Sequence, residues 1–187
     1  MYGYQYPNGK KCFYEIMKHY TSYYANYKNI PKSYMCVGIS RMCPKWFLEN
    51  QNELKNFLWV KDNILAPSEQ LLNSAKHGNT DISQYKKEYI ETLFKKTKEV
   101  GYKDIPDFIH QVDDSFSNCL SSYDAIVFMC YESPNEFCHR HLLRRLLNNV
   151  YNIDCEEYGV KDIDTWGYKP TNNISQEEIN ANTTALF

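Results

Sequence analysis

The 187-residue chain has no apolar run long enough to cross a membrane, and its N-terminal sequence, MYGYQYPNGKK, lacks the apolar core of a signal peptide. We therefore expect a protein that acts in the cytoplasm without a membrane partner. The seven cysteines are an odd number in a chain without a leader. We interpret them as reduced thiols and not as a disulfide framework.

Several patterns that identify common ligands are also missing. The chain contains no Gly-x-Gly-x-x-Gly and no Walker loop, which excludes a dinucleotide or triphosphate bound in either of those ways. It has no Cys-x2-Cys pair, and its cysteines lie in or beside apolar runs, so the sequence predicts no metal and no cofactor. The net charge is −2 with the basic residues dispersed, which argues against a nucleic-acid partner.

The residues that are present favour a single globular α/β domain. Hydrophobic residues make up 43% of the chain and charged residues 24%, as in ordinary globular proteins. Apolar and β-forming runs predict strands at 13–20, 34–39 and 123–130, with a further edge strand within 155–166. Amphipathic patterns predict helices at 67–75, 81–101 and 105–116, whereas 54–65 suits either a helix or an irregular segment. We predict one three-layer domain over residues 1–169, with a mainly parallel sheet flanked by helices, followed by a polar tail over 170–187.

Residues 123–147 form the most informative segment, because they combine a buried strand, a short acidic loop and an amphipathic helix. The uninterrupted apolar run Ala125–Cys130 predicts a strand that is covered on both faces. Ser133 and Glu136 have the spacing of a capping box, which predicts that the helix begins there with Pro134 in its first position, unless Asn135 is the cap. Open α/β folds usually bind ligands at such a junction, at the carboxyl end of a strand.

Four side chains near this junction are candidates for a site. Glu132 on the loop is the best candidate for a general base, because loops at strand ends hold catalytic carboxylates. Cys138, His139 and Arg140 fall in the first turns of the predicted helix, where the helix dipole favours anions and lowers the pKa of a thiol. Each also has a structural interpretation: a surface acid, a packed thiol, a capping imidazole and a solvated guanidinium, in that order.

Polar residues also follow the two earlier strands. Thr21 and Ser22 follow the strand predicted at 13–20, and Ser40 and Arg41 follow the one predicted at 34–39. Parallel strands end at one edge of a sheet, so we expect these residues to bind ligand at the same edge as Glu132. Arg41 suits bidentate binding of a phosphate or carboxylate, and its alternative role is to pair with a nearby acid.

The junction resembles the Domain of Unknown Function 488 (DUF488) family. The family signature is a hydrophobic strand, a Cys-x-Glu segment and a Cys-His-Arg sequence that opens a helix. Here these segments are Cys130-Tyr131-Glu132 and Cys138-His139-Arg140. The resemblance continues upstream through Tyr20-Thr21-Ser22, Gly38-Ile39-Ser40-Arg41, Pro44-Lys45-Trp46-Phe47, Leu65-Ala66-Pro67-Ser68 and Tyr85-x-x-x-Tyr89, and it spans residues 14 to 168. It carries little information on function, because the family is named for lacking one.

The mixture of acid, thiol, imidazole and guanidinium groups predicts a site for a small anionic ligand, nucleotide-like or phosphorylated. In the enzyme hypothesis Glu132, Cys138 and His139 carry acid/base or nucleophilic chemistry, while Thr21, Ser22, Ser40, Arg41 and Arg140 bind the ligand. An alternative is a sensor or sponge that holds such a ligand unchanged. Another is a protein-interaction module that uses the N-terminal segment, where eight of the 17 tyrosines precede residue 28. The sequence does not decide between an enzyme and a binding protein, and it is compatible with an assembly of identical copies.

Overall fold

A five-stranded parallel sheet forms the centre of the computed structural model, which describes residues 3–5, 11–13, 17–49, 54–117 and 123–160. The strand order is β5-β4-β6-β3-β7, and all neighbouring strands run parallel. The strands are β3 (Lys18–Tyr23), β4 (Tyr34–Gly38), β5 (Phe57–Trp59), β6 (Ala125–Cys130) and β7 (Cys155–Glu157). A separate antiparallel pair is formed by β1 (Gly3–Gln5) and β2 (Lys11–Phe13).

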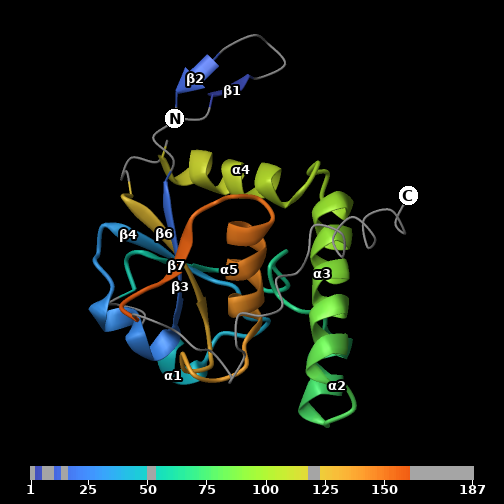
Figure 1. Ribbon diagram of the computed structural model, residues 1–187. Helices are drawn as coiled ribbons and strands as arrows, with labels where there is room; N and C mark the ends of the chain where they lie inside the picture. The colour runs from blue at the N-terminus through green and yellow to red at the C-terminus, as the bar shows by residue number, and fades with distance from the viewer. Residues whose placement is uncertain (1–2, 6–10, 14–16, 50–53, 118–122, 161–187) are drawn as a thin grey trace.

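Helices connect the strands and cover the sheet (Figure 1). They are η1 (Tyr24–Asn29), α1 (Lys45–Leu48), α2 (Glu69–Lys76), α3 (Ile82–Glu99), α4 (Ile105–Ser117) and α5 (His139–Asn149). The side chains of Ser68 and Asp81 cap α2 and α3 by accepting hydrogen bonds from main-chain N–H groups. No helix in the described part of the chain combines the length and apolar character needed to cross a membrane.

The central strand β6 separates two cores, which makes the domain three-layered. Ile126 and Phe128 pack with residues of α2, α3, α4 and α5 on one face of the sheet. Val127 and Met129 pack on the other face with an aromatic cluster from η1, α1 and β5. All six residues of β6 are buried. The α/β fold with a parallel sheet is therefore as predicted. Ala125–Cys130 is apolar throughout because both faces of β6 are buried, also as predicted.

The first predicted strand was placed too early in the sequence. β3 begins at Lys18 and continues through Thr21 and Ser22 to Tyr23, because it pairs with β6 along its whole length, from Lys18 opposite Ala125 to Tyr23 opposite Cys130. Thr21 and Ser22 therefore lie inside the strand and do not follow it. Of the predicted range, residue 13 belongs to β2 and residues 14–16 lie outside the described residues.

The predicted start of the last helix is also wrong, because α5 begins at His139 with Cys138 as its N-cap. The Ser133 N–H does donate to the Glu136 carboxylate (2.8 Å), as in a capping box, but the main chain forms only a turn there. Phe137, between this turn and α5, packs edge-to-face on Tyr85 of α3 (4.9 Å between ring centroids).

Two other uncertain segments are resolved in part. Residues 54–65 form neither a helix nor a wholly irregular segment, since they contain the short strand β5. The edge strand predicted within 155–166 is present as β7. Residues 161–166 and the predicted tail at 170–187 lie outside the described residues.

Candidate functional site

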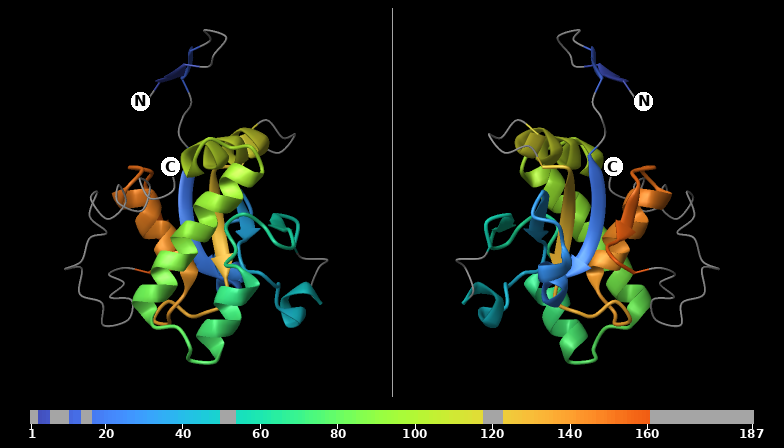
Figure 2. Two further views of the ribbon diagram at one scale, coloured as in Figure 1. Left: turned by 90° about the vertical axis from the view of Figure 1, so that its right-hand side faces the viewer. Right: turned by 90° about the vertical axis from the view of Figure 1, so that its left-hand side faces the viewer.

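The carboxyl ends of β4 and β6 and the loop between β6 and α5 meet at one edge of the sheet. Figure 2 shows the strands running toward this edge, at the end of the molecule where α1 and α2 lie. β4 ends at Gly38 and is followed by Ser40 and Arg41, while β6 ends at Cys130 and is followed by Glu132. The parallel pairing of β4 with β6 brings the two segments side by side.

A cavity of about 570 Å³ opens at this edge. Five of the predicted site residues line it together: Ser40, Arg41, Glu132, Cys138 and His139. The rest of the lining includes the aromatic residues Tyr85, Tyr131 and Phe137 and the cationic residues Lys45 and Lys76. The volume is in the range of ordinary small-molecule sites, about 300–1,000 Å³.

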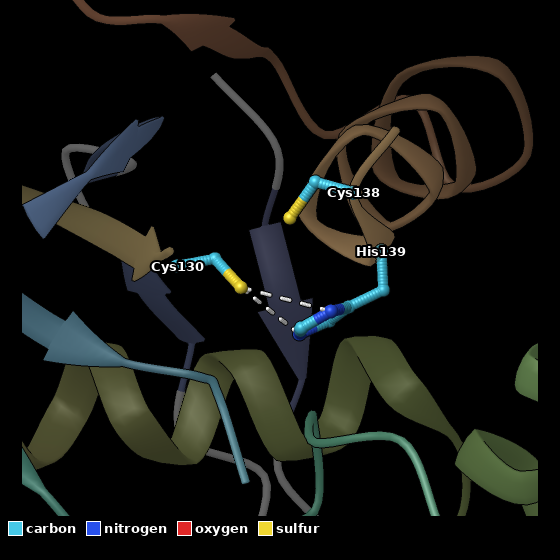
Figure 3. A group of neighbouring side chains, drawn as sticks. All are labelled: Cys130, Cys138 and His139. Atoms are coloured by element: carbon cyan, nitrogen blue, oxygen red, sulfur yellow. Dashed lines mark hydrogen bonds between the residues drawn. The ribbon is translucent and has the colours of Figure 1, made fainter. Parts of the chain in front are cut away.

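Two thiols and an imidazole lie close together (Figure 3), and because all three are buried members of the lining we call them the floor of the cavity. The sulfur atoms of Cys130 and Cys138 and a ring nitrogen of His139 all lie within 4.8 Å of one another. The Cys130 sulfur is 3.7 Å from Nδ1 of His139 and 3.8 Å from Nε2. His139 Nε2 lies 3.1 Å from the Ile39 carbonyl oxygen. Because a carbonyl only accepts hydrogen bonds, Nε2 carries a proton, and Nδ1 is the ring nitrogen that gains or loses a proton.

Glu132 stands beside this cluster. Its Oε2 atom accepts a hydrogen bond from the Cys130 thiol at 3.4 Å. Burial raises the pKa of the Glu132 carboxyl to about 7, with a further upward effect from Cys138. A carboxyl with that pKa exchanges protons close to neutral pH, as a general acid or base must.

The Cys138 thiol and the His139 imidazole shift each other's pKa in opposite directions. Burial favours the neutral thiol of Cys138, but a hydrogen bond from Cys130 and the charges of His139 and Arg140 outweigh it and hold its pKa well below the usual value. Burial likewise opposes protonation of His139, but Cys138 and Glu132 raise its pKa overall. The pair therefore favours a thiolate beside an imidazolium.

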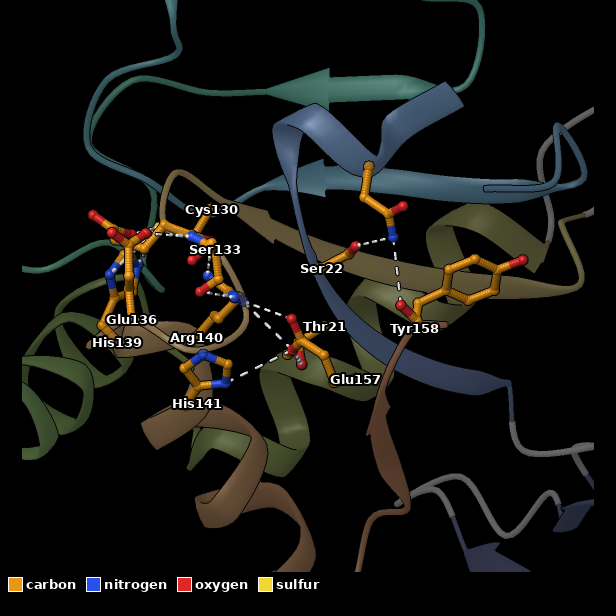
Figure 4. Close-up of polar contacts among 12 residues, drawn as sticks. Thr21, Ser22, Cys130, Ser133, Glu136, His139, Arg140, His141, Glu157 and Tyr158 are labelled. Carbon is orange, nitrogen blue, oxygen red and sulfur yellow. Dashed lines mark hydrogen bonds and ion pairs between the residues drawn. The ribbon is translucent and has the colours of Figure 1, made fainter. Parts of the chain in front are cut away.

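Arg140 has a fully buried side chain and is not among the residues that line the cavity. Figure 4 shows it directed toward Glu157. Its Nε donates to Glu157 of β7 at 3.0 Å. Its Nη1 donates to the Glu132 carbonyl at 2.7 Å, and its Nη2 donates to the Ser133 carbonyl at 3.1 Å. Arg140 thus anchors the loop that carries Glu132. Its expected role in binding a ligand finds no support in this placement.

Thr21 and Ser22 are also buried outside the cavity lining. They were expected to follow the first strand, but they lie within β3, which continues to Tyr23. The Thr21 hydroxyl donates to Glu157 Oε2 at 2.5 Å. Ser22 accepts a hydrogen bond from the Asn26 amide at 3.1 Å. These two residues support β3, β7 and η1 and do not line the site that the sequence assigned to them.

Ser40 and Arg41 line the cavity, but both already have protein partners. Ser40 Oγ donates to the Met42 carbonyl at 2.7 Å and is 2.6 Å from the Tyr24 hydroxyl, which then acts as the donor to Ser40. Arg41 pairs with Asp62 at 2.7 Å and Glu69 at 2.8 Å. Its side chain remains 22% exposed, so part of its guanidinium still faces solvent.

Sequence reasoning missed two contributors. Cys130 was recognised as the last residue of a strand and as part of the Cys-x-Glu signature, but it was not predicted as a residue of the site. Glu157 gave no separate signal, because one acidic residue in a predicted edge strand usually faces solvent. Here it is 3% exposed and is the carboxylate partner of Arg140.

A comparison with protein-family models gives the same family that the segment between β6 and α5 resembles. A family model described as the active DUF488-N3 subclade (DUF488-N3a) matches residues 23–150, which is more than half of the chain. The chain belongs to the DUF488 family. The match includes both parts of the signature, Cys130-Tyr131-Glu132 and Cys138-His139-Arg140. A search of curated proteins and a search of solved structures found no match.

Proposed function

We propose that this DUF488 domain binds a small anionic ligand, nucleotide-like or phosphorylated, in the cavity at the carboxyl edge and carries out acid/base or nucleophilic chemistry on it. The observation that carries the proposal is that one cavity of about 570 Å³ is lined by Glu132, Cys138 and His139 together with three cationic side chains. A site of this size with a few convergent polar groups is the usual form of a small-molecule site.

The charge of the lining favours an anion. Lys45 and Lys76 are exposed at the cavity, and Arg41 contributes a third cation whose charge is shared with Asp62 and Glu69. Glu132 is the one acidic residue among the residues that line the cavity. Lysines at an open cavity act as point charges for phosphate, while the planar donors of arginine add direction.

The aromatic lining favours a ligand with a flat ring. Tyr85, Tyr131 and Phe137 line the same cavity, and Tyr131 is exposed. Aromatic faces stack with nucleobases and other planar groups, and a tyrosine also offers a hydroxyl. A ring between these side chains with a phosphate near the lysines accounts for both parts of the lining.

Three groups in the lining supply the chemistry. Glu132 follows the last residue of β6 by two positions, and Arg140 holds the carbonyl of the same residue, so the carboxylate is presented from a fixed loop. Cys138 and His139 line the same cavity and supply a thiolate nucleophile and a neighbouring imidazolium that can donate a proton. The description of the matched subclade as active supports turnover over simple binding.

A ligand screen followed by product analysis tests the proposal. Thermal shift against nucleotides and sugar phosphates identifies ligands that stabilise the fold, and mass spectrometry of the recovered ligand shows whether it has changed. Glu132→Gln is expected to keep binding within a few-fold and to abolish turnover. Glu136→Gln, on the exposed part of the same loop, is the matched control and is expected to behave as the wild type.

The outcomes separate the enzyme from a sponge. If the wild type returns every tightly bound ligand unchanged after long incubation, the domain is a binding protein. If no anionic compound in the screen shifts the melting temperature, the proposed ligand class is wrong. We place the activity in a cytoplasm, because the described cysteines at 36, 43, 130, 138 and 155 are all free thiols.

A further inference from the structure

We propose that Cys130, Cys138 and His139 form a binding site for Zn²⁺ at the floor of the cavity, with its fourth coordination position open to the cavity. The two sulfur atoms and the imidazole nitrogen lie within 4.8 Å of one another, and all three residues line the cavity. The proposal does not depend on which organic ligand the cavity accepts, but an occupied site would hold Cys138 and His139 as ligands, so that Glu132 would carry the acid/base role of the proposed function.

The spacing of the ligand atoms suits a tetrahedral ion. Zinc binds cysteine sulfur at about 2.3 Å and histidine nitrogen at about 2.0–2.1 Å, so a sulfur and a nitrogen on one zinc are about 3.6 Å apart. The Cys130 sulfur lies 3.7 Å from Nδ1 of His139. It also lies 3.8 Å from Nε2 and therefore faces the flat side of the ring, so binding requires a small rotation of the Cys130 side chain or of the imidazole.

The surroundings of His139 are those of a metal-binding histidine. Its Nε2–H donates to the Ile39 carbonyl at 3.1 Å, so Nδ1 is the nitrogen that an ion would bind, in place of the proton that the imidazolium carries there. Histidine ligands of zinc almost always donate their other ring N–H to a carbonyl or carboxylate in this way. The interaction joins α5 to the segment that follows β4, so the ring is held by two elements.

The charges of the group also fit. Cys138 is the N-cap of α5, where its side chain makes no capping hydrogen bond and the positive end of the helix dipole favours a thiolate. Two thiolates balance the charge of Zn²⁺, so the occupied site adds no net charge to the interior. The mixture of two thiolates and one imidazole is typical of zinc and not of magnesium or calcium.

Three protein ligands and an open position distinguish catalytic zinc from structural zinc. The fourth position faces the cavity, where Glu132 Oε2 lies 3.4 Å from the Cys130 sulfur. A water molecule on the ion would have this carboxylate as a neighbour. No metal was predicted from the sequence, because the chain lacks a Cys-x2-Cys pair; the ligands proposed here come from a strand end and a helix start that are eight residues apart.

Titration of the metal-free, reduced protein with Co²⁺ and then Zn²⁺ tests the site. We expect one Co²⁺ per chain, a thiolate-to-cobalt charge-transfer band in the near ultraviolet, and loss of that band on adding one equivalent of Zn²⁺. Cys130→Ser and Cys138→Ser are each expected to weaken the band and the affinity at least tenfold. Cys43→Ser is the matched control, because Cys43 lines the same cavity outside the group of three and its loss should leave binding unchanged.

A second measurement on the wild type covers the case in which a serine variant fails to fold. Zn²⁺ is expected to protect Cys130 and Cys138 from alkylation, read by mass spectrometry, and to leave the labelling of Cys43 unchanged. Absence of the charge-transfer band in the wild type, or equal labelling of Cys130 and Cys138 with and without Zn²⁺, would show that the site does not bind zinc. The organic-ligand screen is a separate experiment, so the failure of either proposal can be recognised without the other.

Discussion

The guanidinium of Arg140 donates to the main-chain carbonyl of Glu132 at 2.7 Å, so an arginine with a fully buried side chain fixes the backbone of the candidate general base. The same guanidinium is paired with Glu157 at 3.0 Å. The position of the acidic loop therefore depends on an ion pair between α5 and β7, on the side of the loop away from the cavity.

Removing the charge of Glu157 should destabilise the domain. Glu157→Gln leaves the buried Arg140 charge without its carboxylate, and breaking one side of a buried ion pair costs about 3–5 kcal/mol. Urea unfolding followed by circular dichroism measures the change. Glu156→Gln on the exposed side of the same strand is the control and is expected to change stability by no more than about 0.5 kcal/mol. Equal stability of the two variants would mean that the pair does not hold the loop.

Alkaline pH should destabilise the domain through Cys36. Burial raises the pKa of this thiol to about 12 from an ordinary value of 9.0, so the folded state keeps a proton that the unfolded state loses. Between pH 9 and about 12 the folded state binds more protons than the unfolded state. The contribution of Cys36 to the free energy of unfolding is therefore complete below pH 9 and is lost as the pH rises toward 12. Within that range one such thiol lowers the free energy of unfolding by about 1.4 kcal/mol per pH unit.

Urea midpoints measured between pH 8.5 and 10 test this prediction. Cys36→Ala is expected to be less stable at pH 8 but to show a shallower loss with rising pH than the wild type. An unchanged slope in Cys36→Ala would show that other groups account for the alkaline effect.

A side chain at position 38 should strain the end of β4. A Cβ atom on Gly38 would lie 2.8 Å from the Tyr24 hydroxyl and 2.9 Å from Trp59 Cδ1, closer than real contacts allow. Gly38→Ala is therefore expected to cost about 1–3 kcal/mol by overpacking. In a Tyr24→Phe background the cost should shrink, because the nearest clashing atom is gone. Additive effects of the two substitutions in urea unfolding would contradict this contact.

Lys76 should contribute to the affinity for an anion. Lys76→Met is expected to weaken the binding of a phosphorylated ligand about tenfold, since losing a charge-assisted contact costs about 1.5 kcal/mol. Lys87→Met, on the exposed face of α3 and outside the cavity lining, is the control. Isothermal titration with the best ligand from the screen gives both affinities, and equal affinities would place the anion elsewhere.

The sequence predicted elements whose signals are local. The run Ala125–Cys130 is apolar on both faces and forms the central strand, and the helices predicted at 67–75 and 81–101 are present as α2 and α3. The end of β3 was not predicted correctly, because it is determined by pairing with β6, which is about a hundred residues away in the sequence. The start of α5 was not predicted correctly because the turn at Ser133 has the sequence and one hydrogen bond of a capping box, although the helix begins only at His139.

Residues that follow the ends of β4 and β6 or begin α5 were correctly expected to lie near one another. The expectation failed for residues that are buried outside the cavity lining. Ser40, Arg41, Glu132, Cys138 and His139 line one cavity as their positions suggested. A sequence does not show which of two adjacent polar residues turns inward. His139 faces the cavity, whereas Arg140, the next residue, is directed to Glu157.

The buried contacts of Arg140 and Thr21 with Glu157 limit how far this domain can be truncated. The family match covers residues 23–150, but Thr21 and Glu157, which complete the buried interaction, lie just beyond its two limits. A fragment trimmed to the match would lack β7 and most of β3, and it would bury a guanidinium with no carboxylate to neutralise it. The smallest unit that can present the acidic loop therefore extends from before β3 to the end of β7, so deletion variants intended to isolate the site must keep both edges.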